Sequence, residues 1–240
     1  MAKICIDIGN TRTKIARFEE AEIVDYFFFN NDDIELEKII FTPKDSIVVC
    51  SVFQDSTRFM HYLQNIDNVT FLNSKTKFPI EIDYDTTSTL GLDRIMAACG
   101  ANTIFPGKNN LIINCGTCIT IDLLVIPSRF LGGNISPGMK MRARALDEFT
   151  AKLPLVYFAD LNNSDEILGK STIQAIELGI LQGIAFEITG YFNSLSKKYP
   201  DLNVVITGGD SDYLVNRLNF KTFVDPFLVL RGMNQIEIKK

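Results

Sequence analysis

The sequence predicts an α/β protein made of two similar halves, and three observations support this class. Short apolar, β-branched stretches that are typical of strands alternate with longer stretches of helical periodicity. A strand, a tight turn with glycine and threonine, and two further strands occur at Gly9 and again 107 residues later at Gly116. A length of 240 residues suffices for one large or two small domains. We therefore expect domains at residues 1–108 and 109–240, with a site between the two halves.

The first half is expected to begin with an antiparallel meander of three strands. Residues 3–8 are apolar and end at a glycine turn, and strands at residues 14–18 and 23–29 follow after short turns. The aromatic run at residues 26–29 is typical of a strand that is buried on both faces. A fourth strand is expected at residues 46–52. Apolar residues at helical spacing then predict a helix whose apolar face is formed by Phe59, Tyr62, Leu63 and Ile66.

The second half is expected to repeat the meander, with strands at residues 111–114, 118–126 and 129–131. A helix at residues 139–152 should end there, because the residue before Pro154 disfavours helical geometry.

A later helix should begin at Ser171 or Thr172, since either residue suits an N-cap. Gly179 and Gly183 lie four residues apart on this helix and predict close packing against another helix. A last strand is expected at residues 203–207.

Composition narrows the class of function. The formal net charge of −5 disfavours a nucleic-acid binder, because phosphate backbones need a basic face. No apolar run approaches the roughly 18 residues of a membrane span, and charges interrupt the N-terminus where a signal peptide needs an apolar core. The five cysteines are odd in number and lie in apolar surroundings, which indicates reduced thiols and a cytoplasmic location.

The turn at residues 7–14 is the first candidate site. Gly9 permits a tight turn and close approach to a ligand, successive amides can cradle phosphate oxygens, and Lys14 or Arg12 adds positive charge. Asp7 stands at the strand end, where a carboxylate can hold hydrated Mg²⁺. The segment matches neither a Walker loop nor a GxGxxG fingerprint, and an ordinary hairpin turn is the alternative interpretation.

The turn at residues 114–120 is a second candidate phosphate turn. Cys115 and Cys118 have a redox spacing, but β-branched residues follow where a thioredoxin-type site needs a helix. Zinc is disfavoured as well, because the sequence has one histidine, His61, expected on a helix surface, and no second cysteine pair.

Three further segments contain glycine at places where a ligand could approach. Residues 91–94 hold Asp93 beside Arg94, so the carboxylate could accept a proton from an alcohol while the arginine holds an anion. The alternative is that Asp93 simply caps the following helix. Residues 132–138 form a glycine-rich loop that is either shaped around a ligand or a plain connector, and residues 207–210 end a strand with a glycine pair that could lie under an adenosine.

These segments occur in an order that resembles type III pantothenate kinase, of the acetate and sugar kinase/Hsp70/actin superfamily. The resemblance spans almost the whole chain and rests on six motifs: Asp-x-Gly-Asn-Thr at 7–11, Gly-x-Asp-Arg at 91–94, Gly-Thr-x-x-Thr at 116–120, Gly-Gly-x-Ile-x-Pro-Gly at 132–138, Thr-x-x-Ala-Ile at 172–176 and Thr-Gly-Gly at 207–209. It implies two ribonuclease-H-like (actin-like ATPase) domains with a nucleotide cleft between them, and ATP-dependent phosphorylation of pantothenate to 4′-phosphopantothenate, the first step towards coenzyme A.

The resemblance also implies roles for individual residues. Asp93 would be the general base, and Asp7 would hold Mg²⁺. The ATP phosphates would contact Asp7, Ile8, Gly9, Asn10, Thr11, Arg12, Thr13, Lys14 and Thr117. Pantothenate would contact Tyr84, Gly91, Leu92, Asp93, Arg94 and Thr172. The family is a homodimer whose substrate pocket is completed across the dimer interface, and it requires a monovalent cation, K⁺ or NH₄⁺.

Two positions depart from the family pattern. Asn114 replaces the aspartate that binds the monovalent cation, so one negative charge is lost although an amide oxygen remains, and Thr87 replaces a proline after Tyr84. Two rival functions stay open. One is another kinase or a polyphosphate hydrolase of the same superfamily; the other is a nucleotide-sensing regulator, against which the presence of Asp93 argues.

Overall fold

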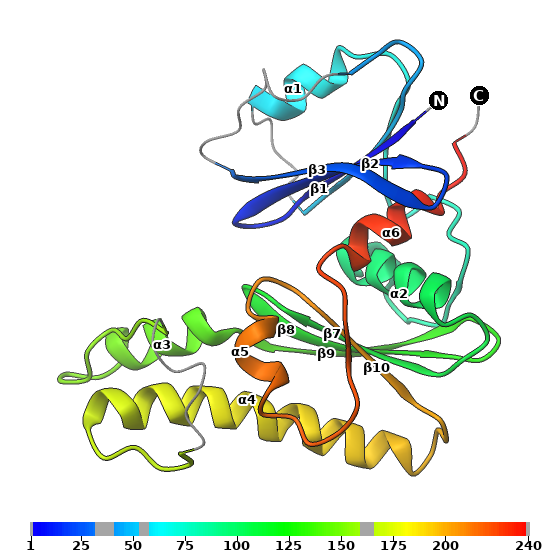
Figure 1. Ribbon diagram of the computed structural model, residues 1–240. Coiled ribbons are helices and arrows are strands. Elements are labelled where there is room, and N and C mark those ends of the chain that lie inside the picture. Colours follow the sequence, from blue (N-terminus) through cyan, green and yellow to red (C-terminus); the bar gives the residue numbers. More distant parts are fainter. Residues whose placement is uncertain (1, 32–40, 53–57, 159–165, 239–240) are drawn as a thin grey trace. The chain divides into compact units, whose positions relative to one another are not determined.

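The computed structural model describes residues 2–31, 41–52, 58–158 and 166–238 (Figure 1). The chain divides into two compact units. Unit 1 comprises Met1–Pro106, Ser128–Leu131 and Phe227–Lys240, and unit 2 comprises Gly107–Pro127 and Gly132–Pro226. This division differs from the expected second domain of residues 109–240, because the C-terminal residues belong to unit 1.

Unit 1 contains a five-stranded sheet in the order β3-β2-β1-β4-β5. The first three strands form the expected antiparallel meander, whereas β4 and β5 add parallel strands on the other side of β1. The strands are β1 (Lys3–Ile8), β2 (Arg12–Glu19), β3 (Glu22–Asn30), β4 (Ser46–Ser51) and β5 (Val69–Phe71). Helix α1 (Arg58–Gln64) buries Phe59 and Leu63 against the isoleucines of β1, while Tyr62 is exposed and His61 lies on the surface as expected.

The aromatic run of β3 is buried on one face, so the expectation of burial on both faces is wrong. Phe29 is 7% exposed and Phe27 packs against the core, whereas Tyr26 and Phe28 remain 52% and 46% exposed. The reason is that β3 is the edge strand, and the outer rings are partly covered by Phe227, whose ring centroid lies 4.9 Å from that of Tyr26.

Two helices of unit 1 approach each other closely through glycine. These are α2 (Leu92–Ile104) and α6 (Leu228–Asn234). A Cβ on Gly100 would lie 2.1 Å from the Leu228 carbonyl oxygen, and one on Gly232 would lie 1.8 Å from the Met96 carbonyl oxygen. This packing explains why the C-terminal helix belongs to unit 1. The close helix contact expected at Gly179 is wrong, because a Cβ there would meet nothing within 4 Å among the described residues.

The second sheet has the order β11-β10-β7-β8-β9-β6. Its strands are β6 (Glu81–Ile82), β7 (Asn110–Cys115), β8 (Cys118–Val125), β9 (Arg129–Pro137), β10 (Asn203–Thr207) and β11 (Phe223–Val224). Strand β9 begins in unit 1, where Arg129 and Phe130 pair with β6, and continues in unit 2. The short 3₁₀ helix η2 (Thr87–Thr89) follows β6.

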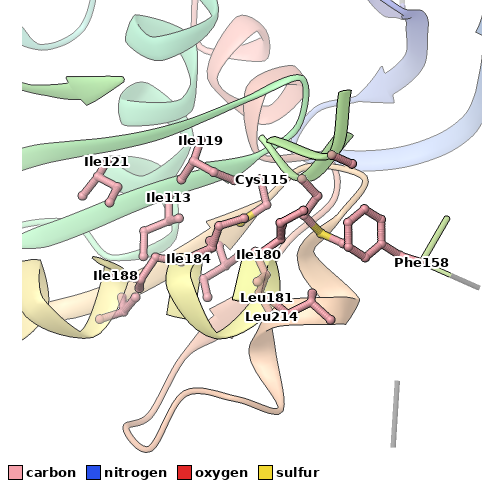
Figure 2. Close-up of a cluster of buried hydrophobic side chains, with 14 of the residues drawn as sticks. Ile113, Cys115, Ile119, Ile121, Phe158, Ile180, Leu181, Ile184, Ile188 and Leu214 are labelled. Atoms are coloured by element: carbon pink, nitrogen blue, oxygen red, sulfur yellow. The ribbon is translucent and has the colours of Figure 1, made fainter. Parts of the chain in front are cut away.

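Three helices complete unit 2: α3 (Met139–Glu148), α4 (Thr172–Ser196) and α5 (Ser211–Val215). Helix α3 ends four residues before the predicted end, with the exposed Phe149 as its C-cap. Figure 2 shows the core between this sheet and α4, where Ile113 and Ile121 meet Ile180 and Ile184. Ser171 is the N-cap of α4, because its side chain accepts a hydrogen bond from the Gln174 amide. Over the described ranges, no helix is long and apolar enough to cross a membrane.

Candidate active site

The turn between β1 and β2 presents backbone to solvent. Gly9 donates its amide hydrogen to the Arg12 carbonyl at 3.1 Å, and a Cβ at Gly9 would lie 3.2 Å from the same oxygen. Asn10, Thr11 and Arg12 are exposed, so the turn projects into solvent. A short glycine turn of this kind lets a ligand reach main-chain amides.

Asn31 fixes the shape of this turn, and sequence reasoning missed it. Its side-chain amide donates to the Gly9 carbonyl at 2.7 Å and accepts a hydrogen bond from the Thr13 hydroxyl at 2.9 Å. Its backbone amide also donates to the Thr11 carbonyl at 3.2 Å. Asn31, directly after β3, therefore bonds to Gly9, Thr11 and Thr13 of the turn. Only the register of the strands could have revealed these contacts.

Two carboxyl groups, Asp7 and Asp93, lie close together in unit 1. Asp7 is the second-last residue of β1, opposite Lys14, and is 8% exposed. Burial raises the pKa of Asp7 to about 7, the charge of Lys14 opposes this rise, and the charge of Asp93 adds to it. Two carboxyl groups that lie this close favour either a shared proton or a bound cation.

Asp93 occupies the first turn of α2 but is not its N-cap. The N-cap is Gly91, which offers no side-chain cap, so the interpretation of Asp93 as a capping residue is wrong. Burial raises the pKa of Asp93, whereas hydrogen bonds from its own amide and from that of Arg94, together with the Arg94 charge, lower it in part. Backbone amides of the helix therefore hold the Asp93 carboxylate, and because its pKa stays raised it is a stronger base than a carboxylate in water.

Gly91 makes room for the Asp93 carboxylate. A Cβ at Gly91 would lie 2.6 Å from Asp93 Oδ1, which is closer than real contacts allow. Arg94 is only 4% exposed, and its guanidinium carbon lies 5.8 Å from the Tyr84 ring centroid and 5.9 Å from that of Phe130. Two aromatic faces therefore orient this buried cation. Phe130 was not predicted, because its nearness depends on the pairing of β9 with β6.

Unit 2 contains a second turn, between β7 and β8, where three backbone segments pack together. Gly138 donates its amide to the Thr117 carbonyl at 3.1 Å, and a Cβ on Gly138 would lie 2.2 Å from the Gly116 oxygen. Gly208 has φ of +101°, and a Cβ there would lie 2.2 Å from the Cys115 oxygen. Residues 132–137 belong to strand β9, so the expectations of a loop here and of a strand that ends at residue 131 are wrong. With Gly138 they are part of a dense backbone cluster rather than a plain connector.

The remaining predicted residues of unit 2 lie at two places. Asn114 is at the end of β7, with its Oδ1 3.7 Å from the Cβ position of Gly116, and Thr117 is exposed at the tip of the turn. Thr172 is exposed at the first residue of α4. The predicted residues therefore occur in both units. Within unit 1, electrostatic interactions link Asp93 to Asp7 and to Arg94.

The cysteine pair of this turn does not have the features of a redox site. Cys115 is fully buried, and burial raises its pKa to about 12, so the thiolate is disfavoured. Cys118 Sγ lies 3.9 Å from the thioether sulfur of Met141. All five cysteines carry free thiols, as the sequence predicted.

The two sheets with their glycine turns define an α/β fold class that other solved structures share. A protein from Campylobacter jejuni described as a Baf family transcriptional activator superposes with a TM-score of 0.66 at 24% identity, covering 97% of this chain and 96% of that one. The component A of (R)-2-hydroxyglutaryl-CoA dehydratase from Acidaminococcus fermentans gives a TM-score of 0.57 at 15% identity, covering 98% and 95%. These likenesses confirm the predicted α/β fold class.

The sequence comparisons narrow this class to one family. The family model of type III pantothenate kinase matches residues 3–194. The type III pantothenate kinase of Phocaeicola vulgatus is 38% identical to this chain, and the match covers 97% of this chain and 96% of the relative. The type III pantothenate kinase of Cytophaga hutchinsonii is 40% identical, and the match covers 97% of each chain. The chain belongs to the type III pantothenate kinase family, which confirms the resemblance and makes the protein a phosphotransferase.

Proposed function

We propose that the protein transfers the γ-phosphoryl group of ATP to pantothenate, giving 4′-phosphopantothenate in the first step of coenzyme A biosynthesis. The observation that carries this proposal is the Asp93 carboxylate, which is held at the first turn of α2 beside Asp7 and next to the buried Arg94. A base, an anion-binding cation and a solvent-exposed glycine turn are parts that suit phosphoryl transfer to an alcohol.

In the proposed mechanism, Asp93 accepts the proton of the pantothenate hydroxyl while that oxygen attacks the γ-phosphorus, and the bond between the γ-phosphorus and the β-phosphate oxygen breaks to release ADP. Its raised pKa makes it a stronger base than an ordinary carboxylate. Arg94, held against Tyr84 and Phe130, binds the carboxylate of pantothenate through directed N–H groups. Gly91 leaves the space that Asp93 needs, and Leu92 and Thr172 add contacts to the substrate.

The ATP phosphates bind the turn of residues 7–14 and Thr117. The exposed turn at residues 10–12, the hydroxyl of Thr11 and the charge of Lys14 suit phosphate oxygens. The Thr13 hydroxyl is buried and donates to Asn31, so it supports the turn instead of meeting phosphate as expected. Because phosphoryl transfer needs mainly positioning and charge stabilisation, a turn whose shape is fixed by hydrogen bonds is well suited to it.

The residues present fit a magnesium ion. Asp7 and Asp93 are two acidic groups whose negative charges repel each other, and a divalent cation would relieve this repulsion. In the part of the chain that the structure describes, no group of three or more His, Cys, Asp or Glu side chains could hold a metal by itself. This suits Mg²⁺, which is usually held by one or two carboxylates together with phosphate oxygens and water. When bound at Asp7, the ion would neutralise charge on the phosphates.

We also propose that the protein is a cytoplasmic homodimer. Large apolar side chains are exposed on and between α3 and α4, and patches of this kind mark interaction surfaces. They include Phe149 and Leu168, both 80% exposed, Tyr157 at 76% and Phe186 at 63%. Sedimentation equilibrium would give twice the 27.0 kDa chain mass for a dimer.

The test of the activity is ADP formation from ATP with pantothenate, run separately in potassium, ammonium and sodium salts. Pantothenate-dependent turnover establishes the substrate, and a requirement for potassium or ammonium shows that Asn114 serves a cation site. A panel of sugar acceptors is the control for the rival kinases. Folded protein that forms no ADP with pantothenate in any salt would contradict the proposal.

A further inference from the structure

Helix α3 carries an arginine that the proposed mechanism does not use. Arg142 is the fourth residue of α3, and its side chain turns back toward the end of β9. Its Nε donates to the Pro137 carbonyl at 2.7 Å, and its Nη2 donates to the Ser136 hydroxyl at 3.2 Å. The same Nη2 donates to Glu187 Oε2 of α4 at 2.5 Å. One guanidinium therefore joins β9, α3 and α4 within unit 2 (Figure 1).

These contacts depend on the shape of an arginine side chain and not only on its charge. A guanidinium presents its N–H donors in a fixed plane, whereas the ammonium of lysine is a point charge. The side chains of Arg142 and Glu187 are 24% and 23% exposed, so the pair is shielded from most of the solvent. Hydrogen bonds of a charged donor are also stronger than neutral ones. A rigid group therefore holds Ser136 and Pro137.

Gly183 of α4 leaves room for this guanidinium. A Cβ on Gly183 would lie 3.8 Å from Arg142 Nη1, which is ordinary van der Waals contact, so a longer side chain in this direction would meet the guanidinium. Gly183 is one of the two glycines that the sequence analysis placed against another helix. It lies beside a side chain of α3, and the space above it serves the contact between Arg142 and Glu187.

The segment that Arg142 holds continues into the contact with the β7–β8 turn. Gly138 directly follows Pro137 and donates its amide to the Thr117 carbonyl at 3.1 Å. A Cβ on Gly138 would lie 2.2 Å from the Gly116 oxygen, so main chain packs directly on main chain here. Close-packed groups transmit a displacement to their neighbours. The place of Thr117 therefore depends on where residues 136–138 are held.

We propose that Arg142 is a positioning residue for ATP. Anchored to α4 by Glu187, it holds residues 136–138 against the β7–β8 turn and so keeps Thr117 in place for the nucleotide phosphates. The assignment rests on the proposed function, in which Thr117 contacts ATP. Arg142 acts through the main chain of the turn, and positioning of this kind matters because phosphoryl transfer depends mainly on the placement of its groups.

Arg142→Met tests the proposal, because it keeps the apolar part of the side chain and removes the donors. The KM for ATP should rise about 10-fold, the effect expected from lost hydrogen bonds of a charged group. The kcat and the KM for pantothenate should stay within about twofold of wild type, since the loss concerns nucleotide binding alone. Arg144→Met, at an exposed arginine of the same helix, is the matched control and should keep both KM values.

Variants of Glu187 test the same contact from α4. Glu187→Leu removes the anchor and should raise the KM for ATP, whereas Glu187→Gln keeps an oxygen that accepts from Arg142 and should restore most of the affinity. The melting temperature is measured for each variant. If Arg142 and Glu187 only fastened α3 to α4, their substitution would lower the melting temperature and leave the KM for ATP unchanged.

Cys118 reports on the turn without turnover. It follows Thr117, its Sγ lies 3.9 Å from Met141 Sδ of α3, and the other four cysteines are buried. Its reaction with N-ethylmaleimide, followed by mass spectrometry of the labelled peptide, should be several-fold faster in Arg142→Met than in wild type or Arg144→Met. In calorimetry, the same variant should bind the magnesium complex of a non-hydrolysable ATP analogue about 10-fold more weakly.

Each of three results would overturn the positioning role: analogue affinity of Arg142→Met equal to that of wild type, unchanged labelling of Cys118, or an equal rise of the KM for ATP and for pantothenate. Pantothenate-dependent ADP formation by wild type decides the proposed function separately. Turnover by wild type with unchanged analogue affinity in Arg142→Met rejects the role and keeps the function. Weaker analogue binding and faster labelling in that variant, without turnover by wild type, keep the role and reject the function.

Discussion

Asp93 lies close enough to Asp7 for its charge to raise the pKa of the Asp7 carboxyl. Asp93 stands in the first turn of α2, and Asp7 lies next to the last residue of β1, 86 positions earlier in the chain. The fold therefore brings two acidic groups from distant segments close together, where the charge of Asp93 disfavours ionisation of Asp7. A cation or a transferred proton relieves this repulsion, which suits the pair to phosphoryl transfer.

Asp93→Asn should fold normally and lose most of kcat. A positioned general base contributes about 10²- to 10⁴-fold, and the amide cannot accept the proton. The measurement is steady-state ADP formation, with melting temperature as the control for folding. Turnover near that of wild type would show that Asp93 is not the base.

Gly91→Ala should leave the fold intact and reduce kcat. The new Cβ would lie 2.6 Å from Asp93 Oδ1, so the carboxylate must swing away from its place. A displacement of about 1 Å at a reacting group can cost 10²-fold in rate. Gly190→Ala is the matched control, because a Cβ on Gly190 meets nothing within 4 Å among the described residues. Equal kcat for the two variants would show that the space at Gly91 has no catalytic importance.

Asn31→Ala should raise the KM for ATP more than the KM for pantothenate. Its side chain holds the Gly9 carbonyl and the Thr13 hydroxyl, and without these bonds the turn loses its fixed shape. Asn31→Asp keeps an acceptor for Thr13 but loses the donor to Gly9, so it should recover only part of the affinity. Asn68→Ala, whose side chain bonds to the Pro43 carbonyl on the surface, is the control. A rise of both KM values by the same factor would contradict a specific role in the phosphate turn.

The strands and the first half of the site could be predicted from the sequence because their signals are local. Apolar stretches that end at glycine turns located the meander of β1, β2 and β3, and a carboxylate at a strand end pointed to Asp7. The role proposed for Asp93 rests on Gly91 and Arg94, which lie within two residues of it in the chain.

The other site contacts could not be predicted, because they depend on the pairing of strands that are distant in sequence. Asn31 contacts the first turn only because β3 pairs with β2, and Phe130 reaches Arg94 only because β9 pairs with β6. The exposure of Tyr26 depends on β3 being an edge strand, which composition does not reveal. The spacing of Gly179 and Gly183 predicted a close helix contact at Gly179, but spacing alone does not show which face of a helix meets another helix.

Gly232→Ala should destabilise the protein strongly, because its Cβ would lie 1.8 Å from the Met96 carbonyl oxygen of α2. Backbone cannot move aside as a flexible side chain can, and overpacking of this kind costs about 1–3 kcal/mol or more. Urea denaturation at neutral pH measures the free energy of unfolding. Gly190→Ala is again the control and should gain roughly 0.5–1 kcal/mol, since alanine is the better helix former. Equal stability of Gly232→Ala and wild type would mean that α2 and α6 do not pack as closely as described.

Asp45→Asn should destabilise the protein at neutral pH and less so in acid. Asp45 is 4% exposed, and both its oxygens lie 3.1 Å from Arg17 Nη1, while the Thr42 amide donates at 2.9 Å. Burial alone would raise the pKa of Asp45, but the hydrogen bonds from Thr42 and Arg17 and the Arg17 charge outweigh it and lower the pKa.

A carboxyl whose pKa is lower in the folded chain contributes stability above its unfolded value of 3.8, and this contribution is lost as pH falls through the folded value. The difference in unfolding free energy between wild type and Asp45→Asn should therefore be about 1.5–3 kcal/mol at pH 7 and shrink below about pH 4. Urea denaturation from pH 7 to pH 3 measures it, with the exposed Asp67→Asn as the control. A difference that is independent of pH would show that the ionised Asp45 does not stabilise the fold through Arg17 and Thr42.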